Sequence, residues 1–234
     1  MKKIYLLTTK TLHHLYFFKK LEKKFKIDKI LLETNSVLPK FKIGPTYEKK
    51  RNIFEKKAFF KNKKIQWPKK NLFLSNTINS KKTLNYLRKN KPDLGIVFGT
   101  RKISTNIIKC FKNGLINIHR GKIDEYRGLD TDLWAIYHND FKNIFLTVHK
   151  VNKDLDTGDV FFEKKMNLKK NLKVYMIQYY TTLLAIEGVL KFCDRYTKDK
   201  KINFFKRKKG KYYSFMPYDL RKIVIKKFNN YFNA

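Results

Sequence analysis

The fold is decided by residues 3–33, which read KIYLLTTKTLHHLYFFKKLEKKFKIDKILLE. An apolar run over residues 3–8 predicts a strand, and a second run over residues 28–33 predicts another. Between them, residues 11–25 predict a helix, because apolar residues recur there at helical spacing at Leu12, Leu15, Phe18 and Leu21. The order strand, helix, strand predicts the start of a βαβ arrangement, in which parallel strands alternate with helices.

Later segments continue this alternation. Residues 94–98 form an apolar run, typical of a strand buried on both faces of a parallel sheet, and Gly99 closes it. Residues 115–119 predict another strand. Further helices are expected at residues 79–90, 129–139 and 174–196, and further strands at 145–151 and 159–166. The sequence therefore predicts an α/β fold with a Rossmann-like, open, mostly parallel sheet and helices on both faces. Residues 36–75 predict only a basic helical patch at 47–60, with no chemistry assigned.

The C-terminal segment has a different pattern. Residues 203–205 and 211–215 flank the sequence KRKKG, which predicts a hairpin around a glycine turn. Pro217 then precedes an amphipathic helix, with Asp219 as its expected cap. We therefore expect a catalytic domain over residues 1–198 and a short hairpin and helix extension over residues 199–234.

Composition indicates a globular protein of a reducing compartment. Aromatic residues make up 15% and apolar residues 42% of the chain, and no secretory pattern opens it. The most apolar long stretch, residues 174–192, contains polar residues and indicates a buried helix rather than a membrane span. Cys110 and Cys193 lie far apart and in no metal-binding spacing. We expect a cytoplasmic protein without a bound metal.

The net charge of +36 has two interpretations. Clustered Lys and Arg side chains can neutralise the phosphates of a nucleic acid or an anionic membrane surface. However, only eight of the 55 basic residues are Arg, and Lys accompanies abundant Asn, Ile, Phe and Tyr, which A- and T-rich codons encode. Solvated lysine faces are therefore favoured over a dedicated nucleic-acid surface.

Asn117 and His119 are the first candidate site residues. They lie two apart in a predicted strand, so their side chains share one face, with a hydrogen-bond donor beside a titratable imidazole. Taken alone, such a pair is more often structural than functional. The other histidines favour structural roles as well: His13 and His14 are expected to decorate a helix, and His138 and His149 to be surface or core residues.

The motifs after His119 point to a family. Residues 120–128 read RGKIDEYRG, and residues 155–159 read LDTGD. This order resembles the tetrahydrofolate-dependent formyltransferases, whose pattern is Asn-x-His, a loop ending in Tyr-Arg-Gly, and a loop reading Leu-Asp-Thr-Gly-Asp. The resemblance covers residues 92–162 well, the first strands loosely and the tail in part. The family's usual Ser-Leu-Leu-Pro after the histidine is absent here, which leaves the geometry of that loop open.

The resemblance implies that Asn117, His119 and Asp156 are the catalytic residues. Formyl transfer passes through a tetrahedral intermediate whose oxygen becomes negative, so a donor such as the Asn117 amide must face that oxygen. His119 would move protons between the attacking amine and the departing folate nitrogen, and Asp156 is expected to raise its pKa and to hold a water.

The resemblance also implies the binding residues. The co-substrate would be N10-formyltetrahydrofolate, in the cleft at the carboxyl ends of the strands. Its pocket would be lined mostly by the backbone of one loop and of a facing wall, at Gly99, Thr100, Arg101, Ile103, Asp154 and Leu155. The acceptor would meet Tyr126, Arg127 and Gly128.

The acceptor amine remains open among several classes. Favoured is a nucleotide-linked amino-deoxysugar for surface polysaccharide, because enzymes of that kind resemble this chain in adding a short extension, often with a role in dimerisation. A methionyl-tRNA formyltransferase is the first alternative, which the basic charge favours but the short tail does not. A phosphoribosylglycinamide formyltransferase is the second, although residues 8–12 lack the glycine-rich turn of that class. A basic module that binds RNA or a membrane is the non-enzymatic alternative.

Overall fold

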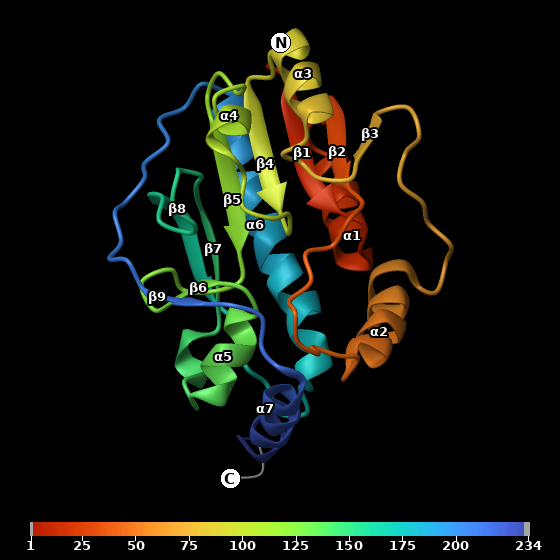
Figure 1. Cartoon of the computed structure of the whole chain (residues 1–234), viewed down its shortest axis with the longest axis vertical. Coiled ribbons are helices and arrows are strands. Elements are labelled where there is room, and N and C mark those ends of the chain that lie inside the picture. The colour runs from red at the N-terminus through yellow and green to blue at the C-terminus, as the bar shows by residue number, and fades with distance from the viewer. Residues whose placement is uncertain (1, 232–234) are drawn as a thin grey trace.

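A seven-stranded sheet forms the centre of the molecule (Figure 1). The structure, a computed structural model, describes residues 2–231. The strand order is β3-β2-β1-β4-β5-β7-β8, and the first five of these strands run parallel. The last two are antiparallel. Their bounds are β1 Ile4–Thr9, β2 Lys29–Glu33, β3 Leu72–Ser75, β4 Leu94–Phe98, β5 Leu115–His119, β7 Phe145–Lys150 and β8 Val160–Lys165.

Helices cover both faces of this sheet, as Figure 1 shows. On one face α1 (Leu12–Leu21) and α6 (Ile177–Thr197) bury an apolar core with alternate residues of the strands, and the end of α2 (Glu48–Phe60) joins it. On the other face α3 (Lys81–Asn90) and α4 (Thr105–Ile108) bury a second core. The expected Rossmann-like α/β fold is confirmed. Among residues 2–231, no helix is both long enough and apolar enough to cross a bilayer.

The C-terminal segment does not form the expected hairpin. Its strand β9 (Lys211–Tyr213) instead pairs in parallel with β6 (Tyr126–Gly128), and Phe205 bridges to Val160 at the start of β8. The two halves of the predicted hairpin therefore form their backbone hydrogen bonds with different strands of the core. The glycine between them has another use: the Gly210 N–H donates to the Ile123 carbonyl at 3.0 Å, and a side chain at Gly210 would collide with the backbone at Asp124.

The last helix fastens the tail to the rest of the molecule. Helix α7 (Tyr218–Tyr231) packs against α5 (Thr131–Tyr137) over a third apolar core, which also includes the 3-10 turns Phe141–Asn143 and Val174–Met176. Arg221 of α7 is buried and donates to Glu48 Oε1 at 2.8 Å and to Asp130 Oδ2 at 2.6 Å. The tail thereby holds the beginnings of α2 and α5 together, below the carboxyl ends of the parallel strands (Figure 1).

Candidate active site

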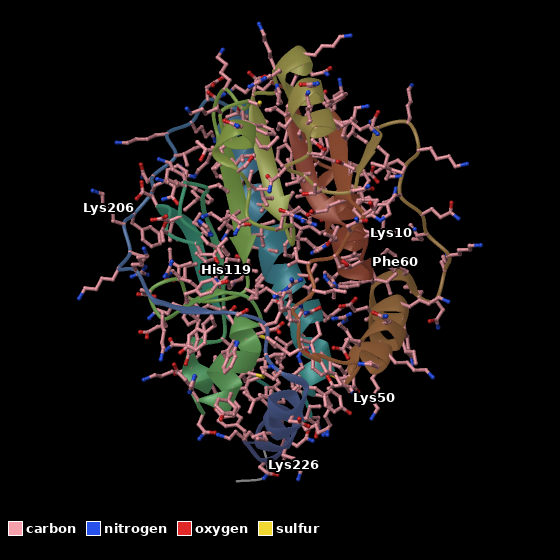
Figure 2. The ribbon with its side chains drawn as sticks, in the orientation of Figure 1. Lys10, Lys50, Phe60, His119, Lys206 and Lys226 are labelled. Carbon is pink, nitrogen blue, oxygen red and sulfur yellow. The ribbon has the colours of Figure 1, made fainter. Side chains whose placement is uncertain are left out.

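The carboxyl ends of the parallel strands open into a cavity of about 650 Å³. Its walls come from the ends of β1, β2, β4 and β5, the loop between β7 and β8, and parts of α1, α2, α5 and α6. His119 lies at this end of the sheet, near the middle of the molecule, whereas Lys50, Lys206 and Lys226 lie toward its edges (Figure 2). A cleft in this place is where open α/β sheets bind ligands.

Asn117, His119 and Asp156 meet in one wall of the cavity. The alternation of β5 puts Asn117 and His119 on the same face of the sheet. Asn117 Nδ2 lies 3.2 Å from Asp156 Oδ1, and His119 Nδ1 lies 3.5 Å from Asp156 Oδ2. The three side chains that the motifs single out thus converge, although Asp156 comes from a different loop.

The partners of His119 assign its tautomer. Nε2 lies 2.8 Å from the Tyr126 carbonyl, which can only accept, so Nε2 carries a proton. In the neutral ring Nδ1 is then the basic nitrogen, and it faces Asp156. Burial lowers the pKa of His119 below 6.5, although Asp156 acts to raise it. Asp156 thus acts on this pKa in the expected direction, but burial outweighs the carboxylate, because the ring is 5% exposed.

Asp156 stays ionised in a buried setting. Burial alone would raise the pKa of its carboxyl, but His119, His149 and the Gly128 N–H together hold that pKa well below its usual range. The Gly128 N–H donates to Oδ2 at 2.9 Å. A fixed negative charge therefore lies beside the His119 ring and stabilises any imidazolium formed there.

His149 is a site residue that the sequence pattern did not reveal. It is buried as expected for a core histidine, yet it also lines the cavity. It lies directly across from Asn117 in the β5–β7 pair. Its Nδ1 is 2.7 Å from the Lys150 carbonyl, so its unprotonated Nε2 accepts from Asn117 Nδ2 at 3.2 Å. This contact turns the Asn117 amide so that its NH2 group faces Asp156. Identifying His149 as a site residue from the sequence would have required knowledge of the β5–β7 register.

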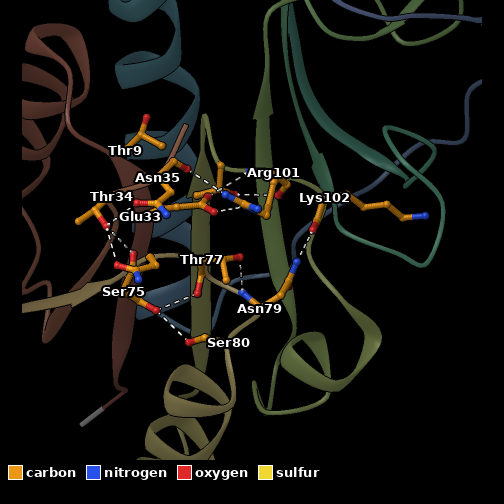
Figure 3. Close-up of polar contacts among 12 residues, drawn as sticks. Thr9, Glu33, Thr34, Asn35, Ser75, Thr77, Asn79, Ser80, Arg101 and Lys102 are labelled. Atoms are coloured by element: carbon orange, nitrogen blue, oxygen red, sulfur yellow. Dashed lines mark hydrogen bonds and ion pairs between the residues drawn. The ribbon is translucent and has the colours of Figure 1, made fainter. Parts of the chain in front are cut away.

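The loop that follows β4 is held rigidly at the cavity. Gly99 has a φ of +74, and a Cβ there would lie 2.3 Å from the His14 ring, so only glycine fits. Gly99, Thr100, Arg101 and Ile103 all line the cavity. The Arg101 side chain forms an ion pair with buried Glu33 at the end of β2, as Figure 3 shows. Its charge is therefore neutralised within the protein.

A second anchor holds the end of the same loop. Asn79 donates to the Lys102 carbonyl at 2.9 Å (Figure 3). It also accepts from the Ser104 N–H at 2.9 Å. Both ends of the loop are therefore held in place at the cavity.

The remaining expected residues divide into two groups. Asp154, Leu155 and Gly128 line the cavity. Tyr126 and Arg127 do not appear among the lining residues. Tyr126 donates to Asp140 at 3.0 Å, and Arg127 donates to the Gly210 carbonyl at 2.7 Å and to the Leu155 carbonyl at 2.9 Å. These two side chains join the β6 loop to the tail and to the Asp156 loop.

His13 and His14 do not decorate the surface of α1. Both are buried, and both line the cavity from the first turn of the helix. His13 Nδ1 lies 3.1 Å from each carboxylate oxygen of Glu55 in α2. The expectation failed because α2, from a segment whose place the sequence did not reveal, covers this side of α1. Among the described residues 2–231, no group of three or more His, Cys, Asp or Glu side chains is placed to hold a metal ion.

Comparison with known proteins places the chain in a family. A sequence profile described as formyl transferase matches residues 24–182. The chain is 31% identical over 100 residues to the bifunctional polymyxin resistance protein ArnA of Wigglesworthia glossinidia brevipalpis, covering 42% of this chain and 15% of that protein. It is 28% identical over 149 residues to the methionyl-tRNA formyltransferase of Borrelia garinii subsp. bavariensis, covering 63% of this chain and 44% of that protein. The chain thus spans less than half the length of these two relatives.

Solved structures share the fold. A 4-N formyltransferase from Francisella tularensis superposes with a TM-score of 0.58 at 19% identity, over 91% of this chain and 76% of that one. The N-formyltransferase from Helicobacter canadensis gives a TM-score of 0.56 at 15% identity, over 92% and 71% of the two chains. HypX from Aquifex aeolicus gives 0.62 at 16% identity, over 97% of this chain and 34% of HypX.

The profile match covers more than half of the residues and includes β4, β5 and the Asp156 loop. It agrees with the order of motifs in the sequence, and the sheet agrees with the solved structures. The chain belongs to the formyl transferase family.

Proposed function

We propose that this protein transfers a formyl group from N10-formyltetrahydrofolate to the amine of a nucleotide-linked amino-deoxysugar. The observation that carries the proposal is the meeting of Asn117, His119 and Asp156 in one wall of the cavity. An amide donor, a neutral imidazole and an ionised carboxylate are the groups that acyl transfer to an amine requires.

The Asn117 amide is proposed to stabilise the oxyanion of the tetrahedral intermediate. Its NH2 group is held at the cavity by two acceptors, His149 Nε2 and Asp156 Oδ1, each at 3.2 Å. When the formyl carbon is attacked, its oxygen gains negative charge and becomes a better acceptor than the neutral His149 nitrogen. The Asn117 N–H that His149 had accepted then donates to that oxygen, and the hydrogen bond to Asp156 keeps the amide oriented.

His119 is proposed to take the proton that the attacking amine must lose. Its lowered pKa keeps the ring neutral at pH 7, and the Tyr126 carbonyl fixes the proton on Nε2, so Nδ1 is free to accept. Protonation at Nδ1 creates an imidazolium beside ionised Asp156, which stabilises it. The same proton can then pass to the folate nitrogen as that nitrogen leaves.

The folate is proposed to lie along the loop that follows β4. Gly99, Thr100, Arg101 and Ile103 would line one wall of its pterin pocket, and Asp154 and Leu155 the other. Because the loop is anchored by Glu33 and Asn79, its backbone groups are preorganised to bind a flat, polar ring. Gly128, which has a φ of +100, is proposed to lie beside the acceptor, with Tyr126 and Arg127 supporting its loop.

The choice of acceptor rests on size and on the solved structures. A cavity of about 650 Å³ suits small molecules rather than a macromolecule. The matching Helicobacter structure holds folinic acid and dTDP-3-aminofucose. The second candidate is methionyl-tRNA, which the names of several curated relatives favour. As part of the same proposal, we infer a reducing, cytoplasmic setting from the free thiols of Cys110 and Cys193. We also infer a homodimer formed through the tail.

The test is formyl transfer by the purified protein. N10-formyltetrahydrofolate is supplied with a panel of nucleotide-linked 3-amino and 4-amino sugars or with methionyl-tRNA, and the release of tetrahydrofolate is followed. We expect turnover with at least one sugar and none with the tRNA. Asn117→Ala and His119→Ala should each lower kcat by at least ~100-fold.

His138→Ala is the matched control, because that ring is exposed and does not line the cavity. It should retain full activity. Turnover with methionyl-tRNA alone would replace the proposed acceptor with the second candidate. A lack of turnover and of folate binding in every combination would overturn formyl transfer itself.

A further inference from the structure

Two arginines on the α6 side of the cavity have only neutral partners. Arg51 of α2 donates from Nη1 to Gln178 Oε1 at 3.1 Å, and its Nε is buried without a hydrogen-bond partner among the described residues. Arg120, the residue after His119, donates to the hydroxyls of Thr181 at 3.1 Å and Thr182 at 3.4 Å. Its guanidinium also lies over the Phe98 ring. Both arginines line the cavity.

Their partners on α6 bring the two guanidiniums together. Gln178, Thr181 and Thr182 are three and four residues apart, so they lie on neighbouring turns of one helix face, about 5–6 Å from each other. Burial lowers the pKa of Arg120, and the positive charge of Arg51 lowers it further. Two positive charges therefore lie side by side at the cavity wall.

Three other arginines of the chain are paired with carboxylates. Arg101 pairs with Glu33, Arg207 with Glu163, and Arg221 with both Glu48 and Asp130. Among residues 2–231, neither Arg51 nor Arg120 has a carboxylate oxygen within 4.0 Å. A half-buried cation without an anionic partner is unfavourable. Binding an anion at this point would therefore be favourable.

The nearby carboxyl groups do not neutralise these two arginines. Glu55 and Asp132 are the carboxylates that act on Arg120 at longer range. Glu55 is in contact with His13, and burial raises its pKa to about 7. Burial raises the pKa of Asp132 to about 6. Near neutral pH Asp132 is largely ionised but Glu55 is only partly so, and the two guanidiniums keep an excess of positive charge.

We propose that Arg51 and Arg120 form a phosphate subsite that binds the phosphate or diphosphate of the acceptor. This inference rests on the proposed function, because it assigns the acceptor's anionic group to the same cavity. Guanidinium groups bind phosphate oxygens through paired N–H donors, and two neighbouring guanidiniums suit a diphosphate.

The subsite lies next to the reacting groups. Arg120 follows His119 directly, so their Cα atoms are about 3.8 Å apart, and the two side chains leave the end of β5 toward opposite faces. Both side chains nevertheless line the same cavity, so a phosphate held by Arg120 shares that cavity with Asn117 and His119. The subsite also gives a use to an arginine in the loop whose sequence departs from the family's pattern.

The experiment measures the binding of inorganic pyrophosphate to the full chain by isothermal titration calorimetry. Arg51→Gln and Arg120→Gln should each weaken binding at least tenfold. Lys50→Gln is the matched control: it removes one charge from the neighbouring position of α2, but Lys50 is exposed and does not line the cavity. It should change the affinity less than twofold. Arg51→Lys and Arg120→Lys, which keep the charge without the paired donors, should give intermediate losses.

Thermal melting and formyltetrahydrofolate binding on the same samples separate the subsite from the fold and from the proposed function. Formyltetrahydrofolate binding should be unchanged in the arginine variants, and their melting temperatures should not fall, because each substitution removes a cation that lacks an anionic partner. Equal losses in Lys50→Gln and the arginine variants, or no pyrophosphate binding to the unmodified protein, would overturn the subsite. If pyrophosphate binding depends on the arginines but folate does not bind, the subsite stands and the proposed function fails.

Competition identifies the source of the phosphate. Uridine diphosphate should displace pyrophosphate, as expected for a nucleotide-linked sugar. Displacement by a CCA oligoribonucleotide instead would keep the subsite and assign it to the end of a tRNA. Displacement by neither molecule would overturn the subsite as a place for the acceptor.

Discussion

Burial and charged or hydrogen-bonding neighbours shift the pKa values of His119 and Asp156 in opposite directions. His119 and Asp156 are both buried, yet the imidazole is kept neutral while the carboxylate is kept charged. The difference arises because Asp156 accepts hydrogen bonds from the Gly128 N–H and the Asn117 amide and lies beside two imidazole rings, whereas His119 has one carboxylate and a large desolvation cost. A neutral base beside a fixed negative charge is the arrangement that proton transfer from an amine needs.

Glu55 gives a test of these electrostatics that does not depend on any substrate. Burial raises its pKa from 4.5 to about 7, and its partner His13 has a pKa lowered well below 6.5 by burial. Between pH 4.5 and 7 the unfolded chain releases the Glu55 proton while the folded protein keeps it, so the free energy of unfolding falls as pH rises. The Glu55→Gln variant lacks this carboxyl group. We therefore expect its free energy of unfolding to fall less steeply with pH, by about 1 kcal/mol per pH unit.

Urea unfolding at pH 5, 6, 7 and 8 measures this effect. The variant should gain stability relative to the unmodified protein as pH rises toward 7, with little further gain at pH 8. Glu125→Gln, at an exposed position, should follow the unmodified protein at every pH. Parallel curves for Glu55→Gln and the unmodified protein would show that Glu55 ionises normally in the fold.

At the scale of elements, the sequence predicts best what depends on local pattern. Strands β4 and β5 begin and end where their apolar runs do, because each run is bounded by turn residues. Strand β3 escaped prediction because it is short, lies at the edge of the sheet and is only partly buried. The hairpin was wrong because strand pairing depends on which partner folds alongside, and β9 finds β6 instead.

The same limit applies to the candidate site. Asn117, His119 and Asp156 could be found because family motifs mark them, and the structure brings them together. His149 and Arg51 could not, since one depends on the register of an antiparallel pair and the other on where α2 docks. Their roles arise from tertiary contacts that no local pattern encodes.

Helix α7 provides the prediction at this scale. Phe228 is fully buried in the core shared with α5, whereas Ile223 on the same helix is 41% exposed. Phe228→Ala should lower the free energy of unfolding by about 3–5 kcal/mol, because it leaves a cavity in that core. Ile223→Ala should change it by less than about 0.5 kcal/mol. Chemical denaturation measures both, and equal effects would mean that the tail is not docked as described.

For the whole molecule, charge opposes compactness. The 55 Lys and Arg residues face 19 Asp and Glu residues, and the resulting charge of +36 must be accommodated by a chain of 234 residues. Many lysines extend outward around the perimeter (Figure 2), which increases the distances between them. Residual repulsion still favours the expanded, unfolded chain.

Added salt should therefore stabilise this protein. Raising sodium chloride from about 0.02 to 0.5 M shortens the Debye length from roughly 20 to 4 Å, so repulsion among exposed lysines is screened. We expect the free energy of unfolding, measured with uncharged urea, to rise by on the order of 1 kcal/mol. A variant with Lys49, Lys50 and Lys57 of α2 changed to Glu should show a smaller rise, because all three are exposed and the change lowers the net charge. A fall in stability with salt would instead mean that attractive surface ion pairs outweigh the excess positive charge.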